Sequence, residues 1–303
     1  MMKLSDYVAQ KIVDYGIRHV FMVTGGGAMH LNHSFGTHKE IECIFNHHEQ
    51  ACAIGAEAYT RLSNRLAVVN VTSGPGGTNA ITGVYGAYVD SIGMLVISGQ
   101  VKWETTVRST GLPLRQYGDQ ELDIEELVRP ITKYCLMVTD PESIRYHLEK
   151  ALYLATAGRP GPVWLDIPLN VQASKINPET LKGFDPKELD EPWKRTNLTE
   201  AAKQTLEKLK TAKRPVIFAG GGVRISGQHE GFIKLVEKLG IPIVTGWNAH
   251  DVIWNNHPQY AGRPGTIGDR AGNFAVQNAD LLLILGSRLN IRQVSYNWQS
   301  LQE

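Results

Sequence analysis

Short apolar runs alternate with amphipathic stretches from the start of the chain. The runs at 19–24, 41–45, 66–72 and 94–98 are typical of buried strands. Before the first run, Val8, Ile12 and Val13 fall on one face of a helical pattern that can end at Gly16. Strands that alternate with helices predict βαβ units, in which helices cover both faces of a parallel sheet. We therefore expect a doubly wound α/β domain.

A second α/β pattern begins after a polar stretch that contains several prolines. Residues 174–198 combine these prolines with many charges, which predicts a linker between a domain at 1–173 and a second domain at 199–303. In the second domain we expect strands at 215–219, 241–245 and 280–286. The predicted fold class is thus α/β, with two doubly wound parallel-sheet domains. The second pattern is short enough to be incomplete at its C-terminal end.

The composition excludes several classes of protein. The chain has 303 residues, 31 Lys and Arg against 30 Asp and Glu, and a net charge of +1, so no strong field favours nucleic acid or a membrane. Polar residues interrupt every apolar run before about 18 residues, the length that a membrane span needs. Cys43, Cys52 and Cys135 have neither disulfide-framework nor metal-site spacing, which favours a cytoplasmic location.

The strongest chemical signal lies at the start of one predicted helix. His47, His48 and Glu49 precede a run of small residues, which predicts a carboxylate in apolar surroundings. Because an unpaired buried carboxylate is costly, Glu49 should share a proton or hydrogen-bond a ligand. The two histidines alone make a poor metal site, and Glu57 with Arg61 is interpreted as a helical ion pair.

Glycine-rich turns follow predicted strands at 25–27, 74–77 and 220–222. Such turns can present free N–H groups to a phosphate at a helix N-terminus. None fits a P-loop or a complete dinucleotide fingerprint, so each is equally consistent with a tight turn that needs glycine for its conformation. The candidate nucleotide site in the second domain consists of Gly220, Gly221, Gly222 and Arg288.

Three motifs taken together go beyond a generic α/β pattern. They span 48–61, 72–79 and 90–101. Their order and spacing resemble the pyrimidine-binding domain of thiamine-diphosphate enzymes, nearest the acetolactate synthase (acetohydroxyacid synthase) large-subunit type. Residues 158–168 add a fourth match, and the second domain resembles the central domain of that family. The resemblance covers nearly the whole chain and is specific for the family rather than for the substrate.

The resemblance implies a role for Glu49. In the family, the equivalent carboxylate hydrogen-bonds N1′ of the cofactor's aminopyrimidine and favours the imino tautomer, whose nitrogen takes the proton from thiazolium C2. The carbanion attacks a 2-oxo acid, carbon dioxide leaves, and a second carbonyl accepts the two-carbon unit. The implied function is a thiamine-diphosphate-dependent carboligase or decarboxylase.

The resemblance also implies which residues surround the cofactor. Gln120 is expected as a catalytic polar group at the reaction site, beside Glu49. His48 is expected either to shape the pocket or to serve the structure alone. The implied cofactor-binding residues are Gly25, Gly26, His48, Glu49, Thr72, Ser73, Gly76 and Asn79.

The chain also departs from the family pattern. The family binds Mg²⁺ and the diphosphate through a Gly-Asp-Gly motif in a third domain, which is absent here, so no metal ligand is expected in this chain. The synthases usually have Phe-Gln-Glu where this chain has 119–121, and Met-His where it has 266–267. These differences leave the donor and acceptor substrates open and do not favour FAD.

We therefore expect the N-terminal portion of a longer enzyme, inactive alone and working as a homodimer or tetramer. The assembly is implied because in the family the pyrimidine domain of one subunit meets the diphosphate domain of another. Two alternatives stay open: an oxidoreductase that binds NAD or FAD at 220–222, and a non-catalytic fragment that binds a full-length partner. Neither a nucleic-acid nor a membrane partner is expected.

Overall fold

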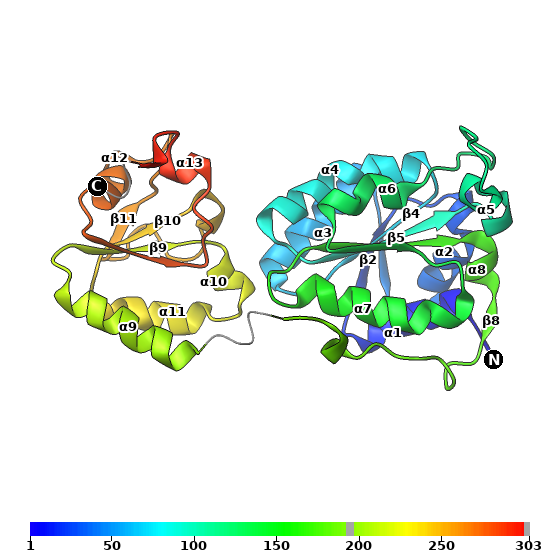
Figure 1. Ribbon diagram of the computed structural model, residues 1–303, viewed down its shortest axis with the longest axis horizontal. Coiled ribbons are helices and arrows are strands. Elements are labelled where there is room, and N and C mark those ends of the chain that lie inside the picture. The colour runs from blue at the N-terminus through cyan, green and yellow to red at the C-terminus, as the bar shows by residue number, and fades with distance from the viewer. Residues whose placement is uncertain (192–196, 300–303) are drawn as a thin grey trace. The chain divides into compact units, whose positions relative to one another are not determined.

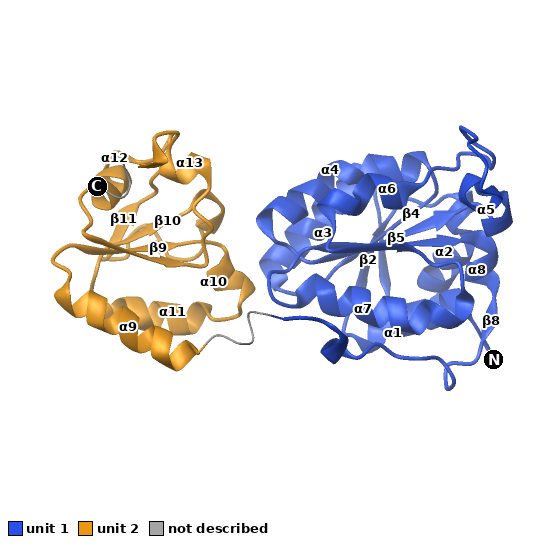
Figure 2. Cartoon of the chain, viewed as in Figure 1, with its two compact units in different colours: residues 1–193 blue, residues 194–303 orange. Residues whose placement is uncertain are grey.

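A computed structural model of the chain describes residues 1–191 and 197–299. It divides into two units, Met1–Trp193 and Lys194–Glu303 (Figure 2). Each unit is built on its own parallel sheet, so the predicted α/β fold class is confirmed. No helix among these residues is long and apolar enough to cross a membrane.

Unit 1 contains a six-stranded sheet with the order β3-β2-β4-β5-β7-β6. Every neighbouring pair is parallel. The strands are β2 (His19–Met22), β3 (Glu42–Phe45), β4 (Val68–Val71), β5 (Met94–Gln100), β6 (Tyr134–Met137) and β7 (Pro162–Pro168). The first four of these are the strands that the apolar runs predict.

Helices cover both faces of this sheet (Figure 1). One face carries α3 (Glu49–Ser63), α4 (Pro75–Asp90) and α6 (Ile124–Val128), and the other carries α1 (Leu4–Asp14) and α7 (Ile144–Thr156). The α1 face holds a large buried cluster in which Val20, Val68, Leu95 and Val163 lie side by side on successive strands of the sheet. This cluster also takes in α2 (Met29–Thr37) and α8 (Leu169–Ala173), while α5 (Val107–Thr110) follows β5.

The segment expected to be a linker packs on unit 1 as far as it is described. Its strand β8 (Lys175–Ile176) pairs antiparallel with β1 (Met2–Lys3). Leu181 is buried in the core beside α1 and α7, and the Phe184 N–H donates to Glu149 Oε2 at 2.9 Å. Apolar residues spaced among the prolines anchor this segment, whereas residues 192–196 of the expected linker lie outside the described residues.

Unit 2 has a four-stranded parallel sheet with the order β11-β10-β9-β12. The strands are β9 (Pro215–Ala219), β10 (Ile243–Thr245), β11 (Tyr260–Gly262) and β12 (Leu281–Leu285). In Figure 1, α9 (Leu198–Thr211) and α11 (His229–Leu239) lie on one face and α12 (Arg270–Gln277) with α13 (Ile291–Val294) on the other. The short helix α10 (Gly222–Ile225) follows β9.

Candidate cofactor site

The glycine loops of unit 1 meet where the strand order reverses. From β2 the chain goes to β3 on one side, and later to β4 on the other side of β2. The Gly25–Gly27 loop follows β2, and the Gly74–Gly77 loop follows β4. In open α/β sheets, ligands bind at such a switch point, outside the carboxyl ends of the strands. The topology therefore places both loops at the expected ligand position.

Glu49 reaches this position from the first turn of α3. His48 is the N-cap of that helix, and its Nδ1 accepts from the Gln50 N–H at 3.1 Å. The partly buried Glu49 accepts a hydrogen bond at Oε2 from Asn79 Nδ2 of α4, at 2.9 Å. The contact joins two of the predicted cofactor-binding residues, which lie 30 positions apart in the sequence.

Thr72 lies between the two glycine loops. Its Oγ1 accepts from the Gly27 N–H at 3.0 Å. A Cβ on Gly25 would lie 2.5 Å from Thr72 Cβ, and a Cβ on Gly76 would lie 2.8 Å from Thr72 Cγ2 and 3.7 Å from Glu49 Oε1. Both glycines are thus required for the close approach of the loops, whereas Gly26 faces open space.

Polar side chains from other elements hydrogen-bond to the backbone carbonyls of the Gly25–Gly27 loop. Asn70 Nδ2 donates to Asn32 Oδ1 at 2.7 Å, and Asn32 Nδ2 donates to the Gly25 carbonyl at 3.2 Å. Gln172 Nε2 donates to the Gly27 carbonyl at 2.7 Å. The sequence interpretation missed these three residues, although Asn70, fully buried within a run of valines, is a visible signal.

Gln120 and Ser73 both contact the glycine loops. Gln120 has a positive φ of 55°, and its carbonyl oxygen lies 2.2 Å from the place of a Cβ on Gly74, so it contacts the second loop through its backbone. The buried Ser73 Oγ lies 2.8 Å from the place of a Cβ on Gly27. The exposed His48 serves α3 as its cap.

Glu121, which the sequence interpretation did not single out, orders the loop that carries Gln120. Its Oε2 accepts from the Tyr117 and Gly118 N–H groups at 3.0 Å each, and its Oε1 accepts from the Val107 N–H. One carboxylate thereby fixes three backbone donors of the 107–121 segment.

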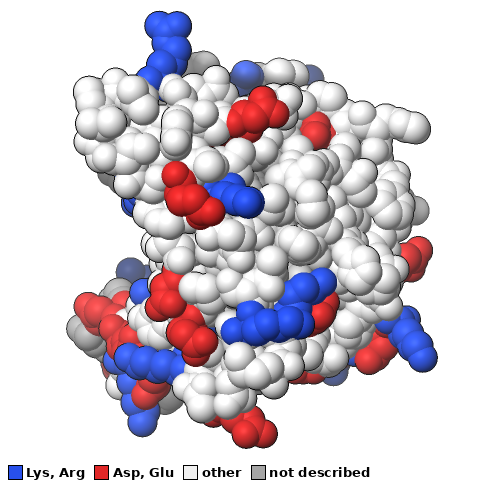
Figure 3. Space-filling model, turned by 90° about the vertical axis from the view of Figure 1, so that its right-hand side faces the viewer, with Lys and Arg blue, Asp and Glu red and all other residues white. Residues whose placement is uncertain are grey.

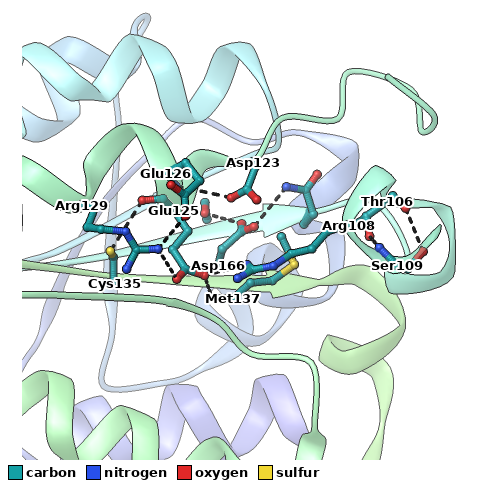
Figure 4. Close-up of polar contacts among 12 residues, drawn as sticks. Thr106, Arg108, Ser109, Asp123, Glu125, Glu126, Arg129, Cys135, Met137 and Asp166 are labelled. Atoms are coloured by element: carbon teal, nitrogen blue, oxygen red, sulfur yellow. Dashed lines mark hydrogen bonds and ion pairs between the residues drawn. The ribbon is translucent and has the colours of Figure 1, made fainter. Parts of the chain in front are cut away.

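Two further buried carboxylates lie beside this segment (Figure 4). Burial opposes the ionisation of Glu125, but hydrogen bonds from Arg108, the Met137 N–H and Arg129 lower its pKa below the ordinary value. The donors lie 2.8, 3.0 and 3.0 Å from the carboxylate oxygens. Burial raises the pKa of Asp166 to about 7, although hydrogen bonds from Ser98 and Gln100 act in the opposite direction.

The predicted Glu57–Arg61 ion pair is confirmed. Arg61 Nε donates to Glu57 Oε1 at 2.9 Å, and its Nη2 also reaches Asp90 Oδ2 of α4 at 2.7 Å. The arginine therefore ties α3 to α4 at the ends away from Glu49.

The residues of the candidate nucleotide site lie at the carboxyl ends of β9 and β12. The Gly220 and Gly222 N–H groups donate to the carbonyls of Leu285 and Gly286, at 2.9 Å each. A Cβ on Gly220 would lie 2.3 Å from the Gly286 oxygen. Close packing of the two turns thus accounts for Gly220 and Gly222, while Arg288 is exposed. Nucleotide binding there stays a hypothesis.

Neither the surface charges at one end of unit 1 nor its described titratable side chains indicate a metal site. Figure 3 views the end of unit 1 where α5 lies, and charged side chains form small separate groups there around uncharged surface. No group of three or more His, Cys, Asp or Glu within residues 1–191 and 197–299 could hold a metal ion. The described part of the site therefore consists of the Glu49 carboxylate, the side-chain amides around it and glycine backbone.

Comparison with known proteins assigns the chain to a class. Residues 2–127 match the thiamine pyrophosphate enzyme N-terminal TPP binding domain, and residues 202–303 match the thiamine pyrophosphate enzyme central domain. The chain therefore belongs to the thiamine pyrophosphate enzymes, whose cofactor is also called thiamine diphosphate.

Within that class, the chain is similar to acetolactate synthase large subunits. It is 35% identical to the large subunit of Lactococcus lactis subsp. lactis over 291 residues, which is 96% of this chain and 49% of the relative. It is 33% identical to the isozyme 3 large subunit of Escherichia coli over 299 residues, 96% of this chain and 50% of the relative. It is 33% identical to a probable large subunit of Methanocaldococcus jannaschii over 302 residues, which is 96% of this chain and 48% of the relative. The chain spans about half the length of these curated relatives.

Proposed function

We propose that the chain supplies the pyrimidine-binding half of a thiamine-diphosphate-dependent carboligase or decarboxylase that acts on a 2-oxo acid. The observation that carries the proposal is the Glu49 carboxylate, held by Asn79 at 2.9 Å beside a glycine that leaves Oε1 uncovered. Family membership and the position at the switch point support it.

The described residues fit an aminopyrimidine ring. Gly25 and Gly76 leave the two loops without side chains, Gly26 adds open backbone, and a partly buried carboxylate stands between α3 and α4. A planar ring with nitrogen donors and acceptors suits a place where one carboxylate lies beside glycine backbone. The fit would be lost if any of these glycines carried a bulky side chain.

The chain's own residues would act on a proton rather than on the substrate bond. When bound, thiamine diphosphate supplies the carbon nucleophile and the electron sink for the decarboxylation of a 2-oxo acid. Asn79 occupies Oε2 of Glu49, which leaves Oε1 to exchange a proton with the ring. Asn32, Asn70 and Gln172 fix the first loop and so fix the place of the ring.

The diphosphate half of the site would come from residues outside this chain. We propose that Mg²⁺ and the diphosphate are held there, and that the assembly is a homodimer or tetramer. α3 and α4 support a partner at this face because they expose large apolar side chains: Ile54 (48%), Leu62 (87%), Tyr85 (55%) and Tyr88 (40%).

Calorimetry and turnover of the full-length protein that contains this chain test the proposal. We expect thiamine diphosphate to bind in the presence of Mg²⁺, and Glu49→Gln to lower pyruvate decarboxylation by about a hundredfold or more. Glu57→Gln is the matched control, since that carboxylate pairs with Arg61. Activity of Glu49→Gln within a few-fold of wild type would show that the assigned role is wrong.

A further inference from the structure

Asp166 is a buried carboxylate outside the residues that contact the proposed cofactor position. It is 1% exposed on β7 and lies opposite Ser98 of β5 in the parallel ladder. Ser98 Oγ donates to Asp166 Oδ1 at 2.6 Å, and Gln100 Nε2 donates to Oδ2 at 3.1 Å. Trp164 Nε1 donates to Ser98 Oγ at 2.8 Å, which extends the network toward α4.

This carboxylate is stabilised by neutral donors alone among the residues that the structure describes. No ion pair to Asp166 occurs there, and the nearest charges from α6 and its cap, Asp123 and Glu125, are also negative. Glu125 has its own partners in Arg108 and Arg129. An unpaired buried charge is costly, so a carboxylate at this place requires a reason beyond packing.

Gln100 connects Asp166 to the loop over the cofactor position. Its Nε2 also donates to the Leu122 carbonyl at 2.8 Å, and its Oε1 accepts from the Val101 N–H at 3.1 Å. Both amide hydrogens of Gln100 are therefore used, one on Asp166 and one on Leu122. Two residues before Leu122, the Gln120 carbonyl rests against Gly74, the N-cap of the helix that carries Asn79.

We propose that Asp166 is a positioning residue of the thiamine diphosphate site: it orients Gln100, and Gln100 holds the 118–122 loop against the Gly74 turn. The proposal rests on the proposed function only for the identity of the ligand. The loop contact itself is a property of the chain without a ligand, so the two ideas are separable by experiment.

The hydrogen-bond pattern explains why an acceptor with two oxygens suits this place. Ser98 and Gln100 both donate to Asp166, one to each oxygen. An asparagine has a single acceptor oxygen, so it can accept from only one of these donors, and its NH₂ group faces the other. Asp166→Asn therefore tests the role of the carboxylate with almost no change in volume.

Hydrogen exchange of the ligand-free protein is the first test. In Asp166→Asn we expect the amides of Val101 and of 117–118 to exchange about tenfold faster, while those in the strands of unit 2 stay unchanged. Gln100→Met should produce the same local change with Asp166 in place, so it serves if Asp166→Asn does not fold. Asp14→Asn, a substitution on the half-exposed surface of α1, is the control. Unchanged exchange at these amides in either folded variant would overturn the proposal.

Trp164 provides a spectroscopic readout of the same carboxylate. The emission difference between wild type and Trp164→Phe should change with pH around a midpoint near pH 7, and the change should vanish in the Asp166→Asn background. A pH-independent Trp164 signal in the wild type would contradict the raised pKa of Asp166.

Cofactor binding completes the test and separates the two proposals. In the full-length protein, Asp166→Asn should weaken thiamine diphosphate binding about tenfold, because the loop that rests against the Gly74 turn loses part of its support. If wild type does not bind the cofactor but the loop still loosens in Asp166→Asn, the proposed function fails and the positioning role survives. If the cofactor binds equally well to both proteins, the positioning role fails.

Discussion

At the scale of single residues, the proposed cofactor site depends on the absence of side chains as much as on Glu49. Gly76 lies between Thr72 and Glu49, and Gly25 meets Thr72 from the other loop. These contacts show that Gly25 and Gly76 are needed because the backbone passes close to Thr72 at both places. They also give a direct test, since α4 contains another glycine, Gly86, at which an added Cβ would meet nothing within 4 Å.

Gly76→Ala should impair the site, whereas Gly86→Ala on the same helix should not. The new methyl group of Gly76→Ala would lie 2.8 Å from Thr72 Cγ2, so we expect destabilisation of about 1–3 kcal/mol and weaker thiamine diphosphate binding. A Cβ on Gly86 meets nothing within 4 Å, so its replacement should stabilise the helix by up to about 1 kcal/mol. Urea unfolding and calorimetry measure both effects. Equal behaviour of the two variants would contradict the proposed contact.

The raised pKa of Asp166 predicts a pH dependence of stability. The folded protein holds this proton up to about pH 7, while an unfolded aspartate releases it near pH 4, so the contribution is present below pH 4 and is lost as the pH rises to about 7. In that window, wild type should lose up to about 1.4 kcal/mol of unfolding free energy per pH unit relative to Asp166→Asn. Denaturant unfolding from pH 4.5 to 7.5 measures the difference. If the unfolding free energies of the two proteins changed with pH in parallel, Asp166 would not have the raised pKa.

At the scale of elements, the sequence predicts regular strands well and their surroundings less well. The runs that became β2 to β5, and those that became β9, β10 and β12, stand out as apolar runs, although β3 and β12 at the sheet edges are only partly buried. The apolar runs do not predict β7, which has proline at both ends. Burial depends on partners that the local sequence does not contain.

The same limit applies to the candidate site. Glu49 and the glycine loops form motifs that are continuous in the sequence, so a resemblance could find them. Asn32, Gln172 and Glu121 act on backbone groups, and the first two reach loops from separate elements. No spacing rule connects such residues before the strand order is known.

The segment after α8 gives an element-scale prediction. Leu181 is 4% exposed in the core of unit 1, so Leu181→Ala should lower the free energy of unfolding by about 2–4 kcal/mol. Leu112, which is 57% exposed, is the matched position, and its replacement should cost less than about 0.5 kcal/mol. Urea unfolding compares the two. If Leu181→Ala were as mild as Leu112→Ala, the segment would be a linker after all.

At the scale of the whole molecule, the chain contains the N-terminal and central domains of a thiamine pyrophosphate enzyme. The chain spans 48–50% of the length of the acetolactate synthase large subunits that it resembles. The described site has the Glu49 carboxylate, and the described residues hold no cluster of metal ligands. Under the proposed function, Mg²⁺ and the diphosphate are held by residues other than those of the described site.

The central claim is that Glu49 activates thiamine diphosphate. The most direct measurement is the rate at which the C2 proton of the bound cofactor exchanges with deuterium, followed by NMR after acid quench of the full-length protein with Mg²⁺. Glu49→Gln should slow this exchange by about a hundredfold or more, while Glu57→Gln leaves it near the wild-type rate. Exchange in Glu49→Gln within a few-fold of wild type, with the cofactor bound, would contradict the claim.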